Sequence, residues 1–283
     1  MSAMEGRTVV VTGPTSGIGK AIARGLAEAG AALVLGCRNT AAGTALAAEL
    51  RGVPNAGSVD VIQVDLSDRK SIDAFARETI ERHPRLDVLV NNAGVSLGTR
   101  PWSKSPDGIE LTFGTNVMGY FLVTRALLAR LRGSAPSRIV NVASTFASDL
   151  DLDDLQFQRR AWDSMKAYAQ SKACDRILTW AIARRLEGSG VTANAMAPGL
   201  IVDTGLYRNT PPPVLSQLRQ RGGGRTPADG ADTAVWLAVS PEVEGITGRF
   251  FENRKEVACA FRDLAREERL WEICEGFAGS SAP

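Results

Sequence analysis

A tyrosine and a lysine four residues apart, Tyr168 and Lys172, form the most informative pair of reactive side chains in this 283-residue sequence. They lie in a stretch that predicts a helix, and residues at positions i and i+4 share a helix face, so one cleft can receive both. A free phenol, with a pKa of about 10, is a poor acid or base at neutral pH, but a neighbouring cation lowers that pKa. The pair therefore predicts a phenol that protonates a carbonyl oxygen or deprotonates an alcohol.

The single histidine, His83, restricts the other chemistries. A serine or cysteine hydrolase would have to be built on this residue, which lies in a charged segment that ends in a proline. A zinc site with two or more histidines is excluded, and the four cysteines are too scattered to serve as paired metal ligands. We therefore predict no metal site, and we expect His83 to lie on the surface at a helix end.

A glycine-rich segment, residues 12–20, follows the first apolar run and has the spacing G-x-x-x-G-x-G. Glycines at such a turn let the backbone approach a pyrophosphate, and the N-terminus of the following helix faces the anion. The segment predicts a dinucleotide-binding turn, with an ordinary glycine-rich turn between strand and helix as the alternative.

Arg38 ends the second predicted strand, where many NAD-binding proteins carry an acidic residue that binds the adenosine ribose. A carboxylate there would repel the 2′-phosphate of NADP, whereas a guanidinium can bind that phosphate through two parallel hydrogen bonds. The sequence thus favours NADP(H) over NAD(H), with an ordinary surface arginine as the alternative.

Short apolar runs alternate with helical stretches along the whole chain. Continuously apolar runs predict buried parallel strands, and the helices between them would cover both faces of the sheet. We predict a single α/β domain over residues 1–283, a Rossmann-type doubly wound parallel sheet of about seven strands. The expected helices are 17–29, 40–50, 71–82, 107–131, 163–186, 227–239 and 258–276.

Two polar stretches interrupt the alternation, at residues 148–160 and 199–225. The second contains three consecutive prolines and three consecutive glycines, which predict a mobile loop with one short helix. Together with the C-terminal helix 258–276, these stretches are expected to form a substrate pocket. Its predicted apolar lining is Leu200, Ile201, Val202, Leu206 and Tyr207, unless these side chains only pack the loop against the core.

The ordered motifs of this chain resemble those of the short-chain dehydrogenase/reductase family. The matching positions are residues 12–19, Asp65-Leu66, Asn91-Asn92-Ala93-Gly94, Asn116, Ser144, Tyr168 with Lys172, and Pro198-Gly199. Within the family, the retinol-dehydrogenase-like branch is indicated by Gly36-Cys37-Arg38-Asn39, Pro106-Asp107-Gly108, Leu270-Trp271-Glu272 and the long gap between Ser144 and Tyr168. Thr15 and Ala197 depart from the Asn and His that are frequent in that branch, so a substrate other than retinoid is expected.

The resemblance implies a role for each matched residue. Tyr168 would be the catalytic acid–base group, and Lys172 would lower its pKa and bind the nicotinamide ribose. Ser144 would hydrogen-bond the substrate oxygen, with Thr145 as its substitute, and Asn116 would hold a water of a proton relay. The cofactor would contact Gly13, Thr15, Ser16, Gly17, Ile18, Gly19, Arg38, Asn39, Asp65, Leu66, Asn92, Ala93, Gly94, Tyr168, Lys172, Pro198 and Gly199.

Some of these positions have plainer interpretations. Ser144 could be a hydroxyl that merely ends a strand, and Asn116 could be a polar group that fills a kink in a helix. Asp65, which the resemblance places near the adenine, could instead cap the next helix.

The activity predicted is NADP(H)-dependent interconversion of a hydrophobic ketone or aldehyde and its alcohol. Reduction of a carbon–carbon double bond, with Tyr168 protonating carbon, is the enzymatic alternative, and an NADP(H)-binding protein without turnover is the non-enzymatic one. Family members often form dimers or tetramers through the helices that would carry Asn116 and Tyr168, so a homodimer or homotetramer is expected.

Charge and hydropathy exclude other partners. A net charge of +2, with arginines spread along the chain, gives no electrostatic reason to expect nucleic acid. No apolar run approaches the roughly 18 residues that span a bilayer, so no membrane span is expected. Sparse cysteines without a signal-peptide pattern predict reduced thiols and a cytoplasmic protein.

Overall fold

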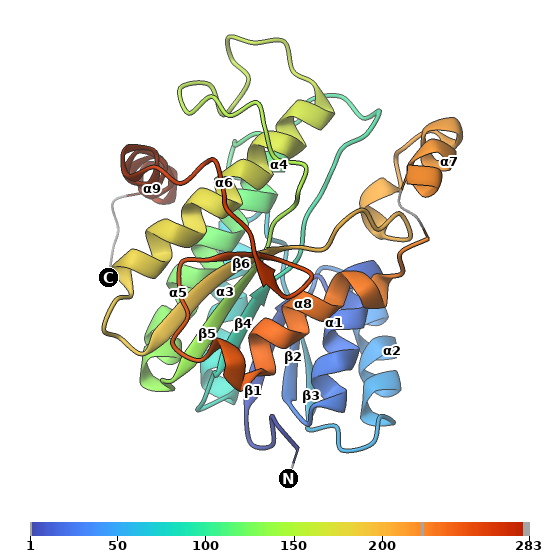
Figure 1. Cartoon of the computed structure of the whole chain (residues 1–283), viewed down its shortest axis with the longest axis vertical. Coiled ribbons are helices and arrows are strands. Elements are labelled where there is room, and N and C mark those ends of the chain that lie inside the picture. The colour runs from blue at the N-terminus through green and yellow to red at the C-terminus, as the bar shows by residue number, and fades with distance from the viewer. Residues whose placement is uncertain (1, 222–223, 280–283) are drawn as a thin grey trace.

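The computed structural model describes residues 2–221 and 224–279 and arranges their strands in one sheet (Figure 1). The order across the sheet is β3-β2-β1-β4-β5-β6-β7-β8, with β1 to β7 parallel and β8 antiparallel to β7. The strands are β1 (Thr8–Thr12), β2 (Ala32–Cys37), β3 (Val59–Gln63), β4 (Val88–Asn91), β5 (Ser137–Val142), β6 (Val191–Ala197), β7 (Phe250–Glu252) and β8 (Lys255–Glu256). The predicted doubly wound parallel sheet is confirmed, and its strand order reverses between β1 and β4.

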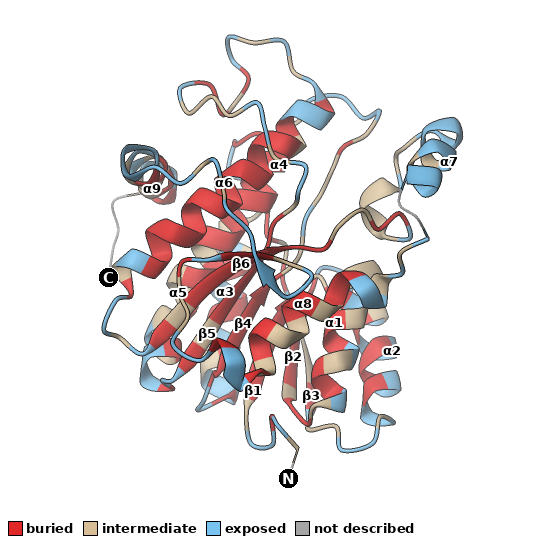
Figure 2. Cartoon of the chain, in the orientation of Figure 1, coloured by how far each residue is buried: buried red, intermediate tan, exposed pale blue. Residues whose placement is uncertain are grey.

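Helices cover both faces of the sheet (Figure 1). One face carries α1 (Gly17–Glu28), α2 (Thr40–Arg51) and α8 (Pro227–Val239), and the other carries α3 (Arg69–Arg82), α5 (Gly119–Gly133) and α6 (Ser164–Arg185). Each face has its own apolar core, and Figure 2 shows the buried residues concentrated in the strands and in α6. The sheet is therefore a fixed platform for the residues at its carboxyl edge.

The C-terminal helix α9 (Leu264–Ala278) packs on α5 and α6. Trp271 meets Phe121 edge to face, with ring centroids 5.1 Å apart, and Arg125 pairs with Glu275 at 2.8 Å. The helices through which the family resemblance predicts subunit association are therefore partly covered by the chain's own α9.

Two helices begin later than predicted. The helix expected from residue 107 begins at Leu111, because the Glu110 carboxylate caps it by accepting from the Phe113 amide at 2.7 Å. The helix expected over 258–276 begins at Leu264, where Asp263 accepts from the Arg266 amide at 2.9 Å. Apolar periodicity extends beyond both starts, but a side-chain cap determines where each helix can begin.

The first of these helices changes its winding in the middle. A short α4 (Leu111–Phe113) leads into a π-helical turn, Gly114–Met118, and then into α5. π-Helical turns occur most often at functional sites. Here the turn contains Asn116, whose side chain is fully buried.

The predicted loop 199–225 contains a 3₁₀ turn, Gly205–Tyr207, and the short helix α7 (Pro212–Arg221). No residue of α7 is buried, and Figure 2 shows it as an exposed arm beside the sheet's carboxyl edge. Gly222 and Gly223 of this predicted loop lie outside the described residues.

His83 was expected on the surface but is buried, with an exposed fraction of 9%. It caps the C-terminus of α3, and its Nε2 lies 3.5 Å from Asp60 Oδ2 on β3. Burial lowers the pKa of His83 more than Asp60 raises it. A buried histidine with a lowered pKa is a poor candidate for acid–base chemistry in a solvent-exposed site. Across residues 2–221 and 224–279, no helix is long and apolar enough to cross a bilayer.

Candidate active site

The residues predicted to do chemistry gather at the carboxyl ends of the parallel strands. The glycine-rich turn follows β1, Gly94 follows β4, Ser144 follows β5 and Gly199 follows β6. This is the upper edge of the sheet in Figure 1, near the point where the strand order reverses. Ligands of open α/β sheets bind at this position, so the predicted residues lie where a dinucleotide would bind.

The glycine-rich turn is packed so closely that two of its positions have no room for a side chain. Gly13 has a φ of +64°, and a Cβ there would come within 2.8 Å of the Ala93 backbone. A Cβ on Gly19 would come within 2.3 Å of the Gly13 carbonyl oxygen. Ser16 precedes α1 and is exposed, and its hydroxyl caps no amide of that helix. The turn therefore fits a phosphate group held by backbone amides and the Ser16 hydroxyl.

Asn92 and Thr12 hold this turn in shape. The Asn92 side-chain amide donates to the carbonyl oxygens of Thr12 at 2.9 Å and Gly13 at 3.1 Å. The Thr12 hydroxyl accepts from the backbone amides of Asn92 at 3.0 Å and Ala93 at 3.2 Å. The Asn92 side chain thus braces the turn, its predicted contact with the cofactor stays a prediction, and the role of Thr12 was not predicted.

Arg38 and Asp65, predicted for the adenosine end, lie together at the edge of the site. Arg38 Nη1 is 3.9 Å from Asp65 Oδ2, and 66% of the arginine side chain is exposed. Asp65 Oδ1 accepts from the amide of Ser67 at 3.0 Å and from its hydroxyl at 2.7 Å. Asp65 is not the cap of α3, because Asp68 occupies that position. The Arg38 guanidinium is only loosely paired and can still reach a ligand.

Other predicted cofactor residues use their side chains for folding. Asn39 caps α2 by accepting from the Ala42 amide at 3.0 Å. Leu66 is 4% exposed and packs against α5 at Gly119. The Leu66 side chain is thus taken up by packing, whereas Asn39 is exposed and uses only its side-chain oxygen for the cap. Thr15 lies in the turn, Ile18 packs toward α8, Ala93 lies against Gly13, and Pro198 and Gly199 follow β6.

Tyr168 and Ser144 come together as predicted, and their side chains are close enough to interact. The Ser144 hydroxyl also accepts from the Phe146 amide at 3.0 Å, which fixes its orientation. Loss of water around the half-buried phenol raises the pKa of Tyr168 to about 12, and the nearby Ser144 hydroxyl only partly offsets this. The two hydroxyls are thus placed to contact one substrate oxygen.

Lys172 forms a buried ion pair with Asp175 on α6, and its predicted effect on the pKa of Tyr168 stays a prediction. Its ammonium donates to Asp175 Oδ2 at 2.8 Å and to the Val142 carbonyl at 3.0 Å, and it lies 6.0 Å from the centre of the Tyr168 ring. Burial opposes the charge of Lys172, but Asp175 and Tyr120 outweigh burial and raise its pKa. The ammonium is therefore held in a buried ion pair beside the phenol.

Asn116 fixes the loop after β4 against α6. Its side-chain oxygen accepts from the Val95 amide at 2.8 Å, and its side-chain nitrogen donates to the Val95 carbonyl at 3.0 Å and to the Ser171 hydroxyl at 2.9 Å. A Cβ on Gly94 would lie 3.5 Å from Asn116 Oδ1 and 3.8 Å from Lys172 Nζ. The fold thus brings Gly94, Asn116 and Lys172 together, while the predicted relay water stays a prediction.

Two buried charges on α6 were not predicted. Asp175 pairs with Lys172, and the Arg176 guanidinium donates to the Ser144 carbonyl oxygen and, at 3.5 Å, to Cys259 Sγ. The guanidinium carbon also lies 3.9 Å from the centre of the Phe250 ring. The available sequence signal was the charged dipeptide itself, which interrupts an apolar stretch in the middle of a helix.

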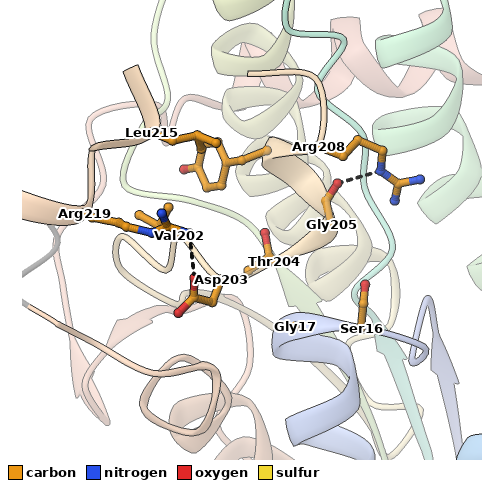
Figure 3. A pocket seen from close by; sticks show the side chains of 10 residues that line it. Ser16, Gly17, Val202, Asp203, Thr204, Gly205, Arg208, Leu215 and Arg219 are labelled. Carbon is orange, nitrogen blue, oxygen red and sulfur yellow. Dashed lines mark hydrogen bonds and ion pairs between the residues drawn. The ribbon is translucent and has the colours of Figure 1, made fainter. Parts of the chain in front are cut away.

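A cavity of about 330 Å³ lies between the glycine-rich turn and the segment after β6 (Figure 3). Its lining residues are Ser16, Gly17, Val202, Asp203, Thr204, Gly205, Tyr207, Arg208, Leu215 and Arg219. Two hydrogen bonds connect lining residues of this cavity. Arg208 donates to the Gly205 carbonyl at 2.7 Å, and Arg219 donates to Asp203 at 3.5 Å. The cavity combines residues of the turn that is predicted to bind phosphate with apolar side chains.

Only part of the predicted apolar lining reaches this cavity. Val202 and Tyr207 line it, whereas Ile201 is buried and packs against Gly230 of α8. Phe146, which was not predicted, stacks on Tyr168 with ring centroids 6.5 Å apart and leaves 47% of its surface exposed. Phe146 therefore provides an apolar surface beside the reactive phenol.

Comparisons with known proteins agree with this geometry. The family model described as short chain dehydrogenase matches residues 7–213. The chain is 39% identical to human Retinol dehydrogenase 14, over 98% of this chain and 87% of that protein. A crystal structure of an uncharacterised protein from Mycobacterium paratuberculosis has a TM-score of 0.74 and 30% identity, over 96% of this chain and 93% of that one.

A second solved structure is that of RhlG from Pseudomonas aeruginosa in an active-site complex with NADP. It has a TM-score of 0.70 and 31% identity, and covers 87% of this chain and 94% of that one. The chain therefore belongs to the short-chain dehydrogenase family, whose members use NAD(P)(H) to interconvert alcohols and carbonyl compounds, and it resembles the retinol dehydrogenases within that family.

Proposed function

We propose that this protein is an NADP(H)-dependent oxidoreductase that interconverts a hydrophobic ketone or aldehyde and its alcohol. The observation that carries the proposal is the pairing of the Tyr168 and Ser144 side chains beside Lys172, with one strand, β4, between β5 and the strand that leads into the glycine-rich turn. A phenol and a hydroxyl that face the same space can share one substrate oxygen, which is the arrangement that proton transfer to a carbonyl requires.

The residues present fit an NADP(H) cofactor. The backbone from Gly13 to Gly17 and the Ser16 hydroxyl would hold the pyrophosphate, and Lys172 would bind the nicotinamide ribose. Arg38, exposed and only loosely paired with Asp65, would bind the 2′-phosphate. Bound NADP(H) supplies or accepts the hydride. The likeness to a protein solved with NADP supports this choice.

The state of Tyr168 favours reduction as the working direction. With a pKa of about 12, the phenol is protonated at neutral pH and can give its proton to a carbonyl oxygen. Ser144 would hold that oxygen, and Arg176, through the Ser144 carbonyl, would hold the serine in place. The chain's own residues thus move one proton and orient one oxygen.

Apolar side chains around the phenol support a hydrophobic substrate. Phe146 stacks on Tyr168, and Val202, Tyr207 and Leu215 line the adjacent cavity. The similarity to proteins named retinol dehydrogenases is consistent with an apolar alcohol or carbonyl compound.

The test follows the loss of NADPH absorbance with a panel of ketones, aldehydes and enones. Tyr168→Phe should lower turnover about 10²–10⁴-fold and leave NADPH binding intact, because only the proton donor is removed. Ser144→Ala should also lose activity. Thr145→Ala, which changes the exposed residue next to Ser144, should keep it.

Three results would contradict the proposal. One is undiminished turnover by Tyr168→Phe, and another is reduction of the enones at the carbon–carbon bond only. The third concerns the cofactor and is a much lower KM for NADH than for NADPH.

A further inference from the structure

One arginine on the wall of the cavity has a guanidinium that no carboxylate balances. Arg208 lies in the segment between β6 and α7, lines the cavity and is exposed. Its Nε donates to the Gly205 carbonyl at 2.7 Å, and Arg208 forms no ion pair within residues 2–221 and 224–279. The other arginine of this wall, Arg219, lies 3.5 Å from Asp203 Oδ1. The charge of Arg208 is therefore available to a ligand in the cavity.

Arg208 faces the glycine-rich turn across the cavity. A Cβ on Gly205 would lie 2.9 Å from Arg208 Nη2 and 3.0 Å from Ser16 Oγ. The guanidinium and the hydroxyl thus approach the same side of Gly205, and Figure 3 shows the Ser16 hydroxyl directed toward the segment that carries Gly205 and Arg208. A Cβ on Gly17 would lie 2.8 Å from Thr204 Cβ. The segment after β6 therefore lies directly against the turn.

The turn itself provides no cationic side chain. Residues 13–17 are all uncharged, and the basic residue that follows, Lys20, pairs with Glu49 at 2.7 Å. The helix dipole supplies only about half a positive charge at the N-terminus of α1. A pyrophosphate is doubly negative, so a phosphate site built from this turn alone would leave much of that charge unbalanced. A guanidinium on the facing wall can balance it through two parallel hydrogen bonds.

We propose that Arg208 binds the pyrophosphate of the dinucleotide and so completes the phosphate site from the segment after β6. This inference rests on the proposed function, and it adds a cofactor contact outside the residues that the sequence predicted. Because NADPH and NADH share the pyrophosphate, Arg208 contributes affinity for both. Arg38, at the adenosine edge, distinguishes between them.

The test uses Arg208→Gln, which removes the charge and retains a polar side chain. Binding of NADPH and of NADH to the full chain is measured by isothermal titration calorimetry without substrate. The Kd for each should rise about 5- to 50-fold, the effect of losing a charge-assisted hydrogen bond at a partly solvated site. Arg38→Gln should instead raise the Kd for NADPH and leave the Kd for NADH unchanged.

Two further variants serve as controls. Arg208→Lys keeps the charge but loses the planar fork of donors, so it should recover only part of the affinity. Arg221→Gln removes an exposed arginine of α7 that does not line the cavity, so it should leave both Kd values unchanged.

Ligand fragments locate the contact on the cofactor. 2′-Phospho-ADP-ribose contains the pyrophosphate but no nicotinamide, and its affinity should fall in Arg208→Gln by the same factor as that of NADPH. 2′-AMP contains no pyrophosphate, and its affinity should not change. Equal losses for the two fragments would overturn the assignment to the pyrophosphate.

Gly205→Ala tests the geometry independently of the arginine. The added methyl group would lie where the Arg208 guanidinium and the Ser16 hydroxyl approach each other, so it should move them apart and raise the Kd for both dinucleotides. Thermal unfolding without ligand should show that both the Gly205 and the Arg208 variants remain folded, because Arg208 is exposed and flexible side-chain ends can shift to admit the methyl group.

An unchanged Kd for both dinucleotides in Arg208→Gln overturns the inference. A loss confined to NADPH also overturns it, because Arg208 would then lie at the 2′-phosphate. The binding assay needs no turnover, so the two proposals fail separately. If the wild type reduces no carbonyl while Arg208→Gln weakens both dinucleotides, the proposed function is wrong and the pyrophosphate contact stands. A wild type that binds neither dinucleotide contradicts both proposals.

Discussion

Helices α6 and α7 border the same site, but α6 is mostly buried and α7 is exposed. Of the 22 residues of α6, 17 are buried, whereas α7 buries none of its 10 (Figure 2). Tyr168 and Lys172 lie on α6 among buried partners, while α7 contributes Leu215 and Arg219 to a cavity wall. Proton chemistry needs groups fixed to a fraction of an ångström, whereas a surface that accepts an apolar substrate does not.

The difference predicts distinct results for substitutions in the two helices. Changes on α6 should act on kcat and on the free energy of unfolding, because each side chain there has buried partners. Changes on α7 should act on KM for the substrate and leave stability nearly unchanged. The following substitutions test this contrast.

The largest effect is expected for Lys172→Met. Turnover should fall about 10²–10⁴-fold, because Tyr168 loses its neighbouring cation and the ribose loses its donor. The free energy of unfolding should also fall, by about 3–5 kcal/mol, because Asp175 is left buried without a partner. Urea unfolding and steady-state kinetics measure the two effects.

A double variant separates the two roles of Lys172. Lys172→Met with Asp175→Leu replaces the ion pair by apolar side chains and should recover most of the stability, because neither charge is then buried. Activity should stay low. Recovery of turnover together with stability would mean that Lys172 is only structural.

A smaller effect is expected for Arg176→Met. The guanidinium holds the Ser144 carbonyl, and its loss should let the serine shift and lower kcat about 10- to 100-fold. The KM for NADPH should not change, because Arg176 lies away from the glycine-rich turn. Arg176→Lys, which can still donate to the Ser144 carbonyl, should recover part of kcat, and an unaltered kcat in the Met variant would show that Ser144 needs no such support.

The smallest effect is expected on α7, for Leu215→Ser. The side chain lines the cavity, so the KM for an apolar substrate should rise about 3- to 10-fold, the effect of a small loss of apolar contact. The free energy of unfolding should change by less than about 0.5 kcal/mol. Val214→Ser, at an exposed neighbour outside the cavity lining, is the matched control and should alter neither quantity. A large loss of stability in Leu215→Ser would remove the contrast between the helices.

The fold was predictable because its signals are local. Apolar runs identified the parallel strands, and Thr226-Pro227 marked the start of α8, where Thr226 and Asp229 form a reciprocal cap. The late start of α9 was not predictable from periodicity. Residues 258–263 continue the apolar pattern, but the chain first forms β8 with β7 and the helix begins only at the Asp263 cap.

The candidate site was predictable where its residues are neighbours in sequence. The pair Tyr168 and Lys172 and the glycine-rich turn each lie within one short segment. The residues that hold the site in place are distant in the chain from their partners. Asn92 bonds to Thr12 of the glycine-rich turn, and Arg176 bonds to the Ser144 carbonyl. Asp175 is near Lys172 in sequence, but only the structure shows that both side chains are buried and form an ion pair.

The most direct test of the central claim follows the hydrogen that reaches the substrate. The enzyme is given NADPH deuterated at the nicotinamide carbon that donates hydride, together with an apolar enone that can be reduced at either group, and the product is analysed by NMR. We expect one deuterium on the carbon that bears the new hydroxyl, and a loss of this product in Tyr168→Phe. Deuterium on the former carbon–carbon double bond, or equal product from the Phe variant, would contradict the account.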